Sequence, residues 1–355
     1  MVRERVLERE PEPEQPTHYD IQMKRRAQRI EEWRAQRKVL CRGRDLRLEL
    51  SPVRGIRQGM LVGTDGGCPT VLLDTRILEI PPGGRSSTHR HVSDALIFVL
   101  EGQGYSYIGG RELRWERWDA LHIPTWTWHY HVNTDPSRPA RFVVFTNAPL
   151  IELLNLAQIE DIGQRPPPAE PDPRTRVPPV PPRAPTFYER ELERAAAIQR
   201  KTAEATLITR WREVKLRVNK KGTRSAFLVD PTLGYNTSGL TMVMFQIAPG
   251  KWQSKHRHGG EAVLYCVEGR GYSVLDDQRY DWEAGDAVLV GKWTWHQHFN
   301  ADPDRVATIL RVHQWESIQT LMSYVLDPLP MYEEPEVLDA PPLHELRWPG
   351  EPHLD

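Results

Sequence analysis

The sequence predicts an all-β protein built from two tandem barrels with a few flanking helices. Three observations lead to this prediction. One histidine pattern occurs twice at a constant spacing, short β-rich runs broken by Gly, Pro and Asp fill both halves, and a proline-rich stretch separates the halves. Many short strands with turns between them are typical of barrels and sandwiches. We therefore expect a duplicated module whose chemistry is carried by histidine.

The repeat extends well beyond the histidines that define it. His89, His91 and His129 recur 167 residues later as His256, His258 and His296. The same spacing relates Glu101, Gly102, Tyr105, Asp119, Trp126, Trp128, His131, Asn133 and Asp135 to Glu268, Gly269, Tyr272, Asp286, Trp293, Trp295, His298, Asn300 and Asp302. Two copies of one unit have thus kept the same internal spacing.

Composition limits the class of partner. The chain has 355 residues, enough for two domains that each bury a core, and a formal net charge of -1. No extended basic face points to nucleic acid or to an anionic membrane. Cys41, Cys68 and Cys266 are too few and too scattered for a disulfide framework, which favours a reducing compartment. No apolar run approaches the roughly 20 residues of a membrane span. We expect a cytoplasmic enzyme or binding protein with a small-molecule partner.

The N-terminal region, residues 1–45, is predicted to be a tail followed by a helix. Residues 1–16 are rich in Glu, Arg and Pro, and we expect them to be disordered. From Tyr19 to about Val39 the composition favours a helix. Its apolar positions Met23, Ala27, Ile30 and Trp33 follow helical spacing, so one face is expected to rest on the body of the protein.

Two β regions follow, separated by a linker. The first domain is predicted over 46–160, where runs such as "VLLDTRILEI" and "ALIFVLEG" alternate with turn residues. The linker, 161–206, contains a proline-rich extended segment at 163–186, for which an interdomain spacer is favoured over a PxxP ligand, and a helix over 187–205. The second domain is predicted over 207–326, and the acidic, proline-rich tail, 327–355, is expected to wrap over the surface.

The histidine spacing places three imidazoles together in each barrel. His89 and His91 are two residues apart, so on a strand both point to the same face, here the barrel interior. His129 arrives on another strand, followed at the same period by His131. Three converging imidazoles suit Fe, Zn, Cu or Ni. The sequence therefore predicts one metal site per half, formed by His89, His91 and His129 and by His256, His258 and His296.

Both halves resemble the cupin superfamily, whose first motif reads G-x5-H-x-H-x3,4-E-x6-G and whose second reads G-x5-P-x-G-x2-H-x3-N. The first motif appears as Gly83, His89, His91 and Gly102, and as Gly250, His256, His258 and Gly269. The second appears as Asp119, Pro124, His129 and Asn133, and as Gly285, Asp286, His296 and Asn300, with Trp118 and Gly291 in place of the usual Gly and Pro. The resemblance implies two double-stranded β-helix barrels.

The glutamate of the cupin motif is missing from both copies. Ala95 and Ala262 stand in its place, and strand alternation points the neighbouring Glu261 away from the metal. Each site is then three neutral histidines. An octahedral ion held in this way keeps about three positions open, which leaves space for a bidentate anionic substrate beside dioxygen.

The stretches "HRHVSDALIFVLEG" and "IPTWTWHYHVN" are similar to the motifs of gentisate and salicylate 1,2-dioxygenases, bicupins with alanine in place of the glutamate. The resemblance implies non-haem Fe(II), one ion per cupin domain, cleavage of a hydroxylated aromatic acid by O2, and a homotetramer. It also implies contact of His131, and of His298 in the second copy, with substrate or dioxygen. The ligand type leaves Mn, Zn and Ni open as alternatives.

The chain departs from that family where the substrate carboxylate is bound. The family's inward arginine, two residues after the alanine, is replaced by Ile97 and Leu264, so the pocket wall is expected to be apolar. A family glutamine on the preceding strand is likewise replaced by Leu78 or Phe245. Alternation along the neighbouring runs predicts other polar groups on the inner face of the first barrel, namely Asp74, Arg76 and Arg141. The matching positions of the second copy are Thr241, Val243, Phe245 and Thr308. Only the first barrel is thus expected to offer cations to a substrate, although Arg76 and Arg141 would also suit ion pairs at the rim.

Three classes of function fit these observations. The favoured one is an Fe(II)-dependent ring-cleaving dioxygenase with catalytic candidates His131, Arg76, Arg141 and Asp74. A three-histidine cupin that cleaves a diketone or another C–C bond, or that isomerises without oxidation, is the second. The third is a non-catalytic metal-binding bicupin. The tryptophans beside His129 and His296 are expected to pack behind the sheet rather than to stack on a substrate.

Overall fold

The computed structural model describes residues 17–36, 38–68, 70–169, 186–314, 332–333 and 338–349. Residues Met1–Arg37 form one unit and Lys38–Asp355 another. The first unit contains helix α1 (His18–Gln36), which confirms the predicted N-terminal helix. The disorder expected for residues 1–16, most of the proline-rich segment and much of the C-terminal tail lie outside the described residues.

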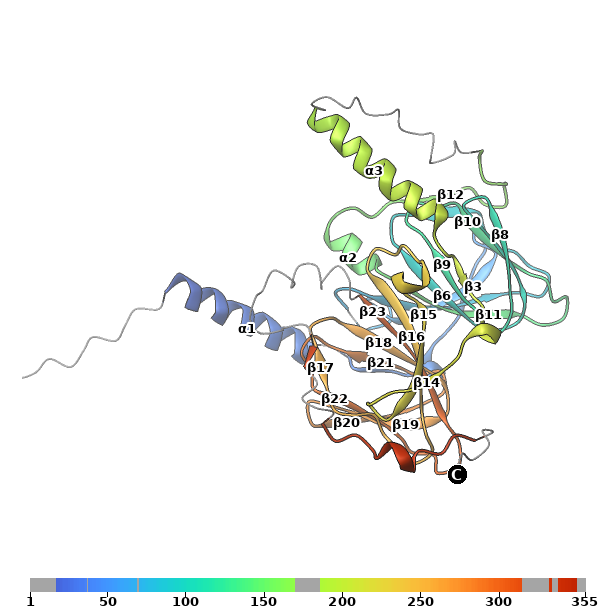
Figure 1. Cartoon of the computed structure of the whole chain (residues 1–355). Helices are drawn as coiled ribbons and strands as arrows, with labels where there is room; N and C mark the ends of the chain where they lie inside the picture. Colours follow the sequence, from blue (N-terminus) through green and yellow to red (C-terminus); the bar gives the residue numbers. More distant parts are fainter. Residues whose placement is uncertain are drawn as a thin grey trace, which may run out of the picture. The chain divides into compact units, whose positions relative to one another are not determined.

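The first barrel consists of two antiparallel sheets (Figure 1). One sheet has the order β13-β9-β6-β11-β4-β3-β2 and the other β12-β5-β10-β7-β8. The strands are β2 (Glu49–Ser51), β3 (Ile56–Val62), β4 (Asp74–Ile80), β5 (His89–His91), β6 (Ala95–Glu101), β7 (Gly104–Ile108), β8 (Arg111–Trp115), β9 (Ala120–Ile123), β10 (His129–Asn133), β11 (Ala140–Thr146), β12 (Ile159–Asp161) and β13 (Ile208–Thr209).

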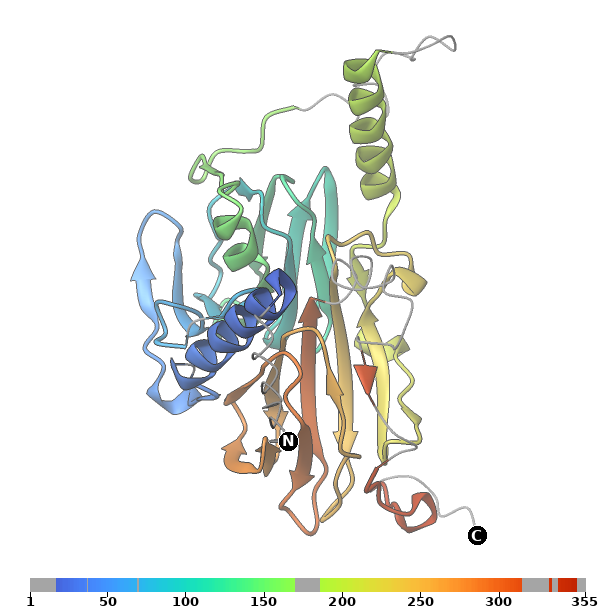
Figure 2. The same ribbon diagram turned by 90° about the vertical axis from the view of Figure 1, so that its left-hand side faces the viewer.

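The second barrel repeats this arrangement. Its large sheet has the order β1-β21-β18-β23-β16-β15-β14, and two smaller sheets have the orders β20-β19-β22 and β17-β24. Figure 2 shows most of its strands in yellow to red. The strands are β1 (Leu40–Cys41), β14 (Arg217–Val218), β15 (Thr223–Val229), β16 (Leu240–Ile247), β17 (Arg257–His258), β18 (Ala262–Glu268), β19 (Arg270–Leu275), β20 (Gln278–Glu283), β21 (Ala287–Val290), β22 (His296–Asn300), β23 (Ala307–Gln314) and β24 (Tyr332–Glu333). The all-β, two-barrel prediction is confirmed.

Strand alternation gives each large sheet two different faces. Ile97, Val99 and Phe142 point into the first barrel and belong to its interior cluster. The intervening residues, such as Phe98, lie in a separate buried cluster that also contains Met244 of the second barrel. The outer faces of the two large sheets therefore pack against each other. Each large side chain buried there contributes about 1.5–3 kcal/mol.

Two short strands are exchanged between the barrels. Leu40 in β1 pairs with Val288 of the second barrel, and Ile208 in β13 pairs with Leu121 of the first. Each exchanged segment continues into a single 3₁₀ turn, η1 (Gly43–Asp45) or η3 (Trp211–Glu213). The domain boundaries proposed from the sequence, at 45/46 and 206/207, thus fall beside segments whose strands belong to the sheet of the opposite barrel.

The repeated aspartates anchor these exchanged segments. Asp286 accepts hydrogen bonds from Arg42 Nη1 (2.8 Å) and from the Gly43 amide (2.9 Å). Its counterpart Asp119 accepts from Arg210 Nη1 (3.1 Å) and from the Trp211 amide (2.9 Å). A buried carboxylate needs such charged and backbone donors. This part of the sequence repeat therefore stabilises the fold and does not belong to the metal sites.

Helices lie outside the sheets. α3 (Phe187–Glu204) confirms the helix predicted in the linker, and it begins with a capping box between Thr186 and Glu189. α2 (Ala148–Leu153), a helix that the sequence analysis did not predict, follows β11. Further 3₁₀ turns are η4 (Pro231–Leu233) and η5 (Leu343–Glu345). Within the described ranges, every helix is too short or too polar to cross a bilayer.

Candidate metal centres and the cavity of the first barrel

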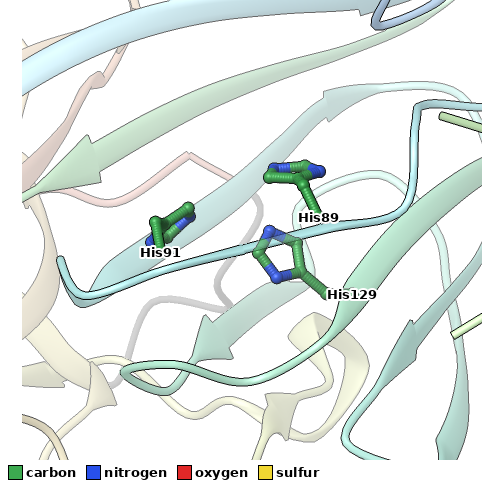
Figure 3. A group of neighbouring side chains, drawn as sticks. All are labelled: His89, His91 and His129. Carbon is green, nitrogen blue, oxygen red and sulfur yellow. The ribbon is translucent and has the colours of Figure 1, made fainter. Parts of the chain in front are cut away.

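The predicted histidine triads assemble in both barrels. In the first, the His129 ring lies 4.2 Å from that of His89 and 5.0 Å from that of His91, centroid to centroid. Figure 3 shows the three imidazoles gathered around one point, two from one segment and the third from another strand. In the second barrel, the ring of His296 lies 4.2 Å from His256 and 4.8 Å from His258. One nitrogen of each imidazole comes within 4.8 Å of the other two in both triads.

Backbone carbonyls fix the tautomer of all six imidazoles. Every Nδ1 lies 2.6–3.0 Å from a carbonyl oxygen, so Nδ1 carries the proton and Nε2 keeps its lone pair. The pairs are His89–Ser87, His91–Ser93, His129–Thr127, His256–Ser254, His258–Gly260 and His296–Thr294. This is the state in which histidine binds a metal.

The protonation state and the spacing of the imidazoles in the triads suit a bound cation. Burial lowers the pKa of His129 well below its usual value and lowers that of His296 to about 4, so both imidazoles are neutral near pH 7. The Nε2 atoms of His256 and His296 face each other at 3.1 Å. With metal–nitrogen bonds of about 2.0–2.1 Å, two ligands of one ion lie about 3 Å apart. The donor set thus fits a divalent transition metal.

A cavity of about 290 Å³ adjoins the first triad. Its wall is mostly aliphatic and aromatic, and its polar lining includes Arg54, Arg76 and His131. α2 and the following loop supply Ala148, Ile151 and other lining residues, so they form part of the enclosure. The apolar wall agrees with the sequence-based expectation that followed from Ile97 and Leu78.

Two arginines enter this cavity, and only one of them was predicted. Arg76 is held by Asp74, with Nη2 3.0 Å from Oδ2, and Asp74 itself binds Thr146 and does not line the cavity. Arg54, which comes from the β2–β3 turn, places Nη2 2.7 Å from Nε2 of His89. Burial and the charge of Arg76 lower the pKa of Arg54. In the described part of the chain, the Nε atoms of both arginines have no hydrogen-bond partner.

His131 is held by a relay that the sequence analysis did not predict. Trp115 Nε1 donates to Ser106 Oγ (3.0 Å), which lies 2.7 Å from His131 Nδ1. With Ser106 Oγ already accepting from Trp115, its hydroxyl is free to donate to Nδ1, which leaves the proton of His131 on Nε2. Burial, followed by the charge of Arg54, lowers the pKa of His131 to about 3. The neutral imidazole therefore presents an N–H donor to the cavity.

The predicted inward position of Arg141 is wrong. Arg141 pairs in the ladder with Glu79, and its guanidinium binds that carboxylate at 2.8 Å on the outer face. Phe142, which pairs with the cavity residue Leu78, is the inward residue. The predicted inward position of Thr308 in the second barrel is wrong for the same reason, because Thr308 pairs with Gln246, which points outward. The inward residues of β23 are Ile309, Arg311 and His313, so the second barrel also contains a cation.

Glu261 lies away from the metal, as expected, and links the two barrels. Its buried carboxylate accepts from the amide of Leu72 at 2.8 Å and from that of Val71 at 3.3 Å. Its counterpart Asp94 accepts from the Ser238 amide (2.6 Å). Each acidic side chain therefore accepts hydrogen bonds from backbone amides in a loop that precedes a strand of the other barrel.

We expect Glu261→Ala to lower the free energy of unfolding by about 2 kcal/mol, because it leaves a buried backbone donor without an acceptor. The matched control is Glu268→Ala, which removes an exposed ion pair with Arg117 and should change stability by less than about 0.5 kcal/mol. Urea unfolding of the two variants measures the difference. Equal stability of the two variants would show that Glu261 does not carry this role.

The repeated tryptophans enclose arginines rather than a substrate. Arg90 lies 4.4 Å from the ring of Trp126 and 4.5 Å from that of Trp128. Arg257 similarly faces Trp293 and Trp295. Neither Trp126 nor Trp128 lines the cavity of the first barrel. Stacking of arginine on the indoles holds the strand of the first two metal ligands against the turn that leads to the third.

Comparisons with known proteins agree with this geometry. Residues 76–146 and 243–313 each match the cupin domain family. The chain is similar to the 5-aminosalicylate 1,2-dioxygenase of a Comamonas species, with 26% identity over 238 residues, 62% of this chain and 60% of that protein. It is also similar to the 1-hydroxy-2-naphthoate 1,2-dioxygenase of Nocardioides sp. strain KP7, with 24% identity over 78% of this chain and 70% of that protein.

Solved structures show the same fold. The salicylate 1,2-dioxygenase of Pseudaminobacter salicylatoxidans superposes with a TM-score of 0.57 at 20% identity and covers 77% of this chain and 80% of that one. Its adduct with gentisate gives a TM-score of 0.59 at 16% identity, over 90% of this chain and 95% of that one. The two segments that match the cupin domain family run from β4 to β11 and from β16 to β23, and each segment contains one of the two histidine triads.

Proposed function

We propose that the protein is a non-haem Fe(II)-dependent dioxygenase that cleaves the ring of a hydroxylated aromatic acid. One observation carries this proposal: in the first barrel, three neutral histidines and two arginines converge on an apolar cavity. The histidines suit a divalent metal, the arginines suit an anionic group, and the apolar wall of the cavity suits the aromatic ring of a substrate. The named relatives, which are ring-cleaving dioxygenases, support the same reaction class.

The size of the cavity suits an aromatic acid. An apolar cavity of about 150 Å³ holds one benzene. The cavity here, about 290 Å³, would accommodate a substituted salicylate or a bicyclic hydroxynaphthoate. Its aliphatic wall contributes burial of the ring, and Arg54 and Arg76 supply the polar contacts that orient the substrate.

In this account, Arg54 and Arg76 bind the substrate carboxylate. Nε2 of His89 cannot accept from Arg54 and bind a metal at the same time, so in the metal-bound protein Arg54 needs another acceptor. A carboxylate is the natural partner of a guanidinium, and the pair forms two parallel hydrogen bonds. Asp74 keeps Arg76 directed toward the same space.

His131 is proposed as the residue that donates a hydrogen bond to the reacting oxygen atoms. Its Nε2–H faces the cavity, and burial lowers its pKa to about 3, so the imidazole stays neutral and acts as a hydrogen-bond donor rather than as an acid. The iron, when bound, supplies neighbouring positions for substrate and dioxygen. Ser106 and Trp115 keep the His131 ring in the required orientation.

The remaining assignments belong to the same proposal. We infer Fe(II) as the native metal, one ion per barrel, a cytoplasmic location and a homotetramer, and these follow from the resemblance to gentisate and salicylate dioxygenases. The domain boundaries 46–160 and 207–326 also remain proposals. Loss of the aromatic absorption band of the substrate under air, and its persistence under argon, is the direct test of ring cleavage by dioxygen.

Arg54→Met is expected to raise KM for a salicylate-type substrate about tenfold to a hundredfold, since a hydrogen bond between charged groups contributes about 1.5–3 kcal/mol. Arg141→Met is the matched control, because Arg141 binds Glu79 outside the cavity and its loss should leave KM within about twofold. Steady-state kinetics with iron-loaded variants measure both. If the two substitutions raise KM equally, Arg54 does not bind the carboxylate.

Ser106→Ala is expected to lower kcat about tenfold to a hundredfold with little change in iron content, because the groups that orient an active-site histidine carry effects of this size. Ser273→Ala removes the equivalent hydroxyl beside His298 in the second barrel and serves as the control for ring cleavage. Equal kcat in both variants and in the wild type would remove the orienting role of Ser106.

A further inference from the structure

The second barrel contains its own pair of cations, although its residues differ from those of the first. In the first large sheet, Arg76 on β4 pairs with Val144 on β11, which in turn pairs with Ile97 on β6. The same row of the second sheet reads Val243, Arg311 and Leu264. One arginine thus stands in the same inward row of each barrel, contributed by a different strand.

The surroundings of Arg311 point to an anionic ligand. Arg311 shares the inward face of β23 with His313, whose ring lies 4.6 Å from that of His258. Burial lowers the pKa of Arg311 itself to about 10. Among the residues that the structure describes, Arg311 has no hydrogen bond or ion pair, and its Nε is buried without a partner.

In the first barrel, a carboxylate neutralises the arginine of this inward row, Arg76. In the described part of the second barrel, Arg311 has no such partner. Asp74 holds Arg76 at 3.0 Å, but the equivalent position in the second repeat is Thr241, which is uncharged. An arginine that is partly buried without a carboxylate is costly unless a ligand supplies the negative charge. The negative charge that would neutralise Arg311 is therefore expected to come from a ligand that enters the barrel.

A second cation occupies the position equivalent to Arg54. Lys221 follows β14 in the turn where Arg54 follows β2, and its carbonyl accepts from the Ser254 amide at 2.8 Å, as that of Arg54 does from Ser87. The second barrel thus repeats the three histidines and the cation of the turn, whereas the arginine of its inward row comes from β23 instead of the strand equivalent to β4.

The second interior leaves less space for a ligand. Phe245 stands where the first barrel has Leu78, and His313 stands where it has Thr146. The His313 ring lies 4.6 Å from that of His258, so it fills the side of the site next to the metal ligands. A ligand of this barrel must be smaller than the aromatic acid proposed for the first.

We propose that the second barrel is a binding site for a small aliphatic carboxylate, which pairs with Arg311 beside a metal held by His256, His258 and His296. The site goes beyond ring cleavage, and it shares with the proposed function only the premise that the histidine triads hold metal. Its ligand is distinct from the aromatic substrate in size and in the barrel that it occupies.

The test uses the full-length His129→Ala variant loaded with Co(II), so that metal remains in the second barrel alone. Acetate is the probe, and the visible absorption of Co(II) reports its binding. In this background, Arg311→Met should raise the Kd for acetate at least tenfold, and Arg311→Lys should preserve most of the affinity. Arg76→Met, in the same row of the other barrel, should change Kd by less than about twofold.

Two results would overturn the proposal: an unchanged Co(II) spectrum in acetate, or equal acetate affinity with and without the Arg311 side chain. If His129→Ala does not fold, the protein with Co(II) in both barrels gives the same answer, since Arg311→Met should then weaken one of two binding events at least tenfold. Oxygen uptake is not measured in this experiment, so its result is independent of whether the first barrel cleaves a ring.

Discussion

His129→Ala is expected to abolish the proposed ring cleavage and to prevent metal binding by the first of the two histidine triads. His129 lies between His89 and His91 in the first triad, and no other side chain of the described chain completes that triad. Removing a group that only orients a metal ligand costs about tenfold to a hundredfold, so the loss of a ligand should exceed this range. We expect turnover to fall at least about 1000-fold.

The matched variant is His296→Ala, which removes the equivalent ligand from the second barrel. This variant should lose the metal of the second barrel and keep ring cleavage, because His131 and the cavity proposed to bind the aromatic substrate lie in the first barrel. Iron content by atomic absorption and turnover with a substituted salicylate are measured on both proteins. Equal loss of turnover in the two variants would contradict a reaction confined to the first barrel.

The metal-free protein will lose stability steeply as the pH falls below about 6.5. Burial lowers the pKa values of the metal-site histidines and of His131, His298 and His313. In the unfolded chain these groups titrate near their ordinary value of about 6.5. Below that pH the unfolded state binds protons that the folded state cannot, so the free energy of unfolding decreases as the pH falls.

The effect is large because many groups act together. Each histidine whose folded-state pKa is far below 6.5 contributes about 1.4 kcal/mol per pH unit over this range. A few such groups match the 5–15 kcal/mol stability of a typical domain, so metal-free protein should unfold by about pH 5. Urea unfolding at pH 7.0 and 5.5 measures this, with Zn(II)-loaded protein as the control that resists the change. Equal stability of the metal-free protein at both pH values would contradict the account.

The metal sites could be predicted from the sequence because their information is local. His89 and His91 share a face through the period of two, and the repetition at His256 and His258 shows that the spacing is retained. The resemblance to the dioxygenase motifs also predicted the apolar wall at Ile97, which stands where the family has an arginine. These features depend on neighbours within a few residues of each other.

The cations could not be placed with equal success because they depend on pairing between distant segments. Arg54 lies in a turn, where no periodicity indicates its direction, and it reaches His89 only in the folded barrel. Arg141 was assigned to the wrong face because its direction is set by pairing with Glu79. The same error in strand alternation placed Thr308 on the inner face of the second copy, where the structure has Arg311.

The exchanged strands were also beyond the reach of local patterns. β1 and β13 contain two residues each, too few to show alternation, and their partners lie in the opposite barrel. α2 is a single short helix after β11, and its six residues are too few for a helical period to appear. Both features form from tertiary packing rather than from intrinsic propensity.

Oxygen uptake by anaerobically purified, Fe(II)-loaded protein tests the central claim most directly. The panel consists of gentisate, salicylate, substituted salicylates, 1-hydroxy-2-naphthoate and catechols. The account predicts uptake of one O2 per aromatic acid consumed, with loss of the aromatic absorption. Uptake should be absent with catechols, which lack the carboxylate for Arg54 and Arg76. An iron-loaded protein that consumes no oxygen with any aromatic acid would contradict the proposed function and favour diketone cleavage, isomerisation or metal binding without catalysis.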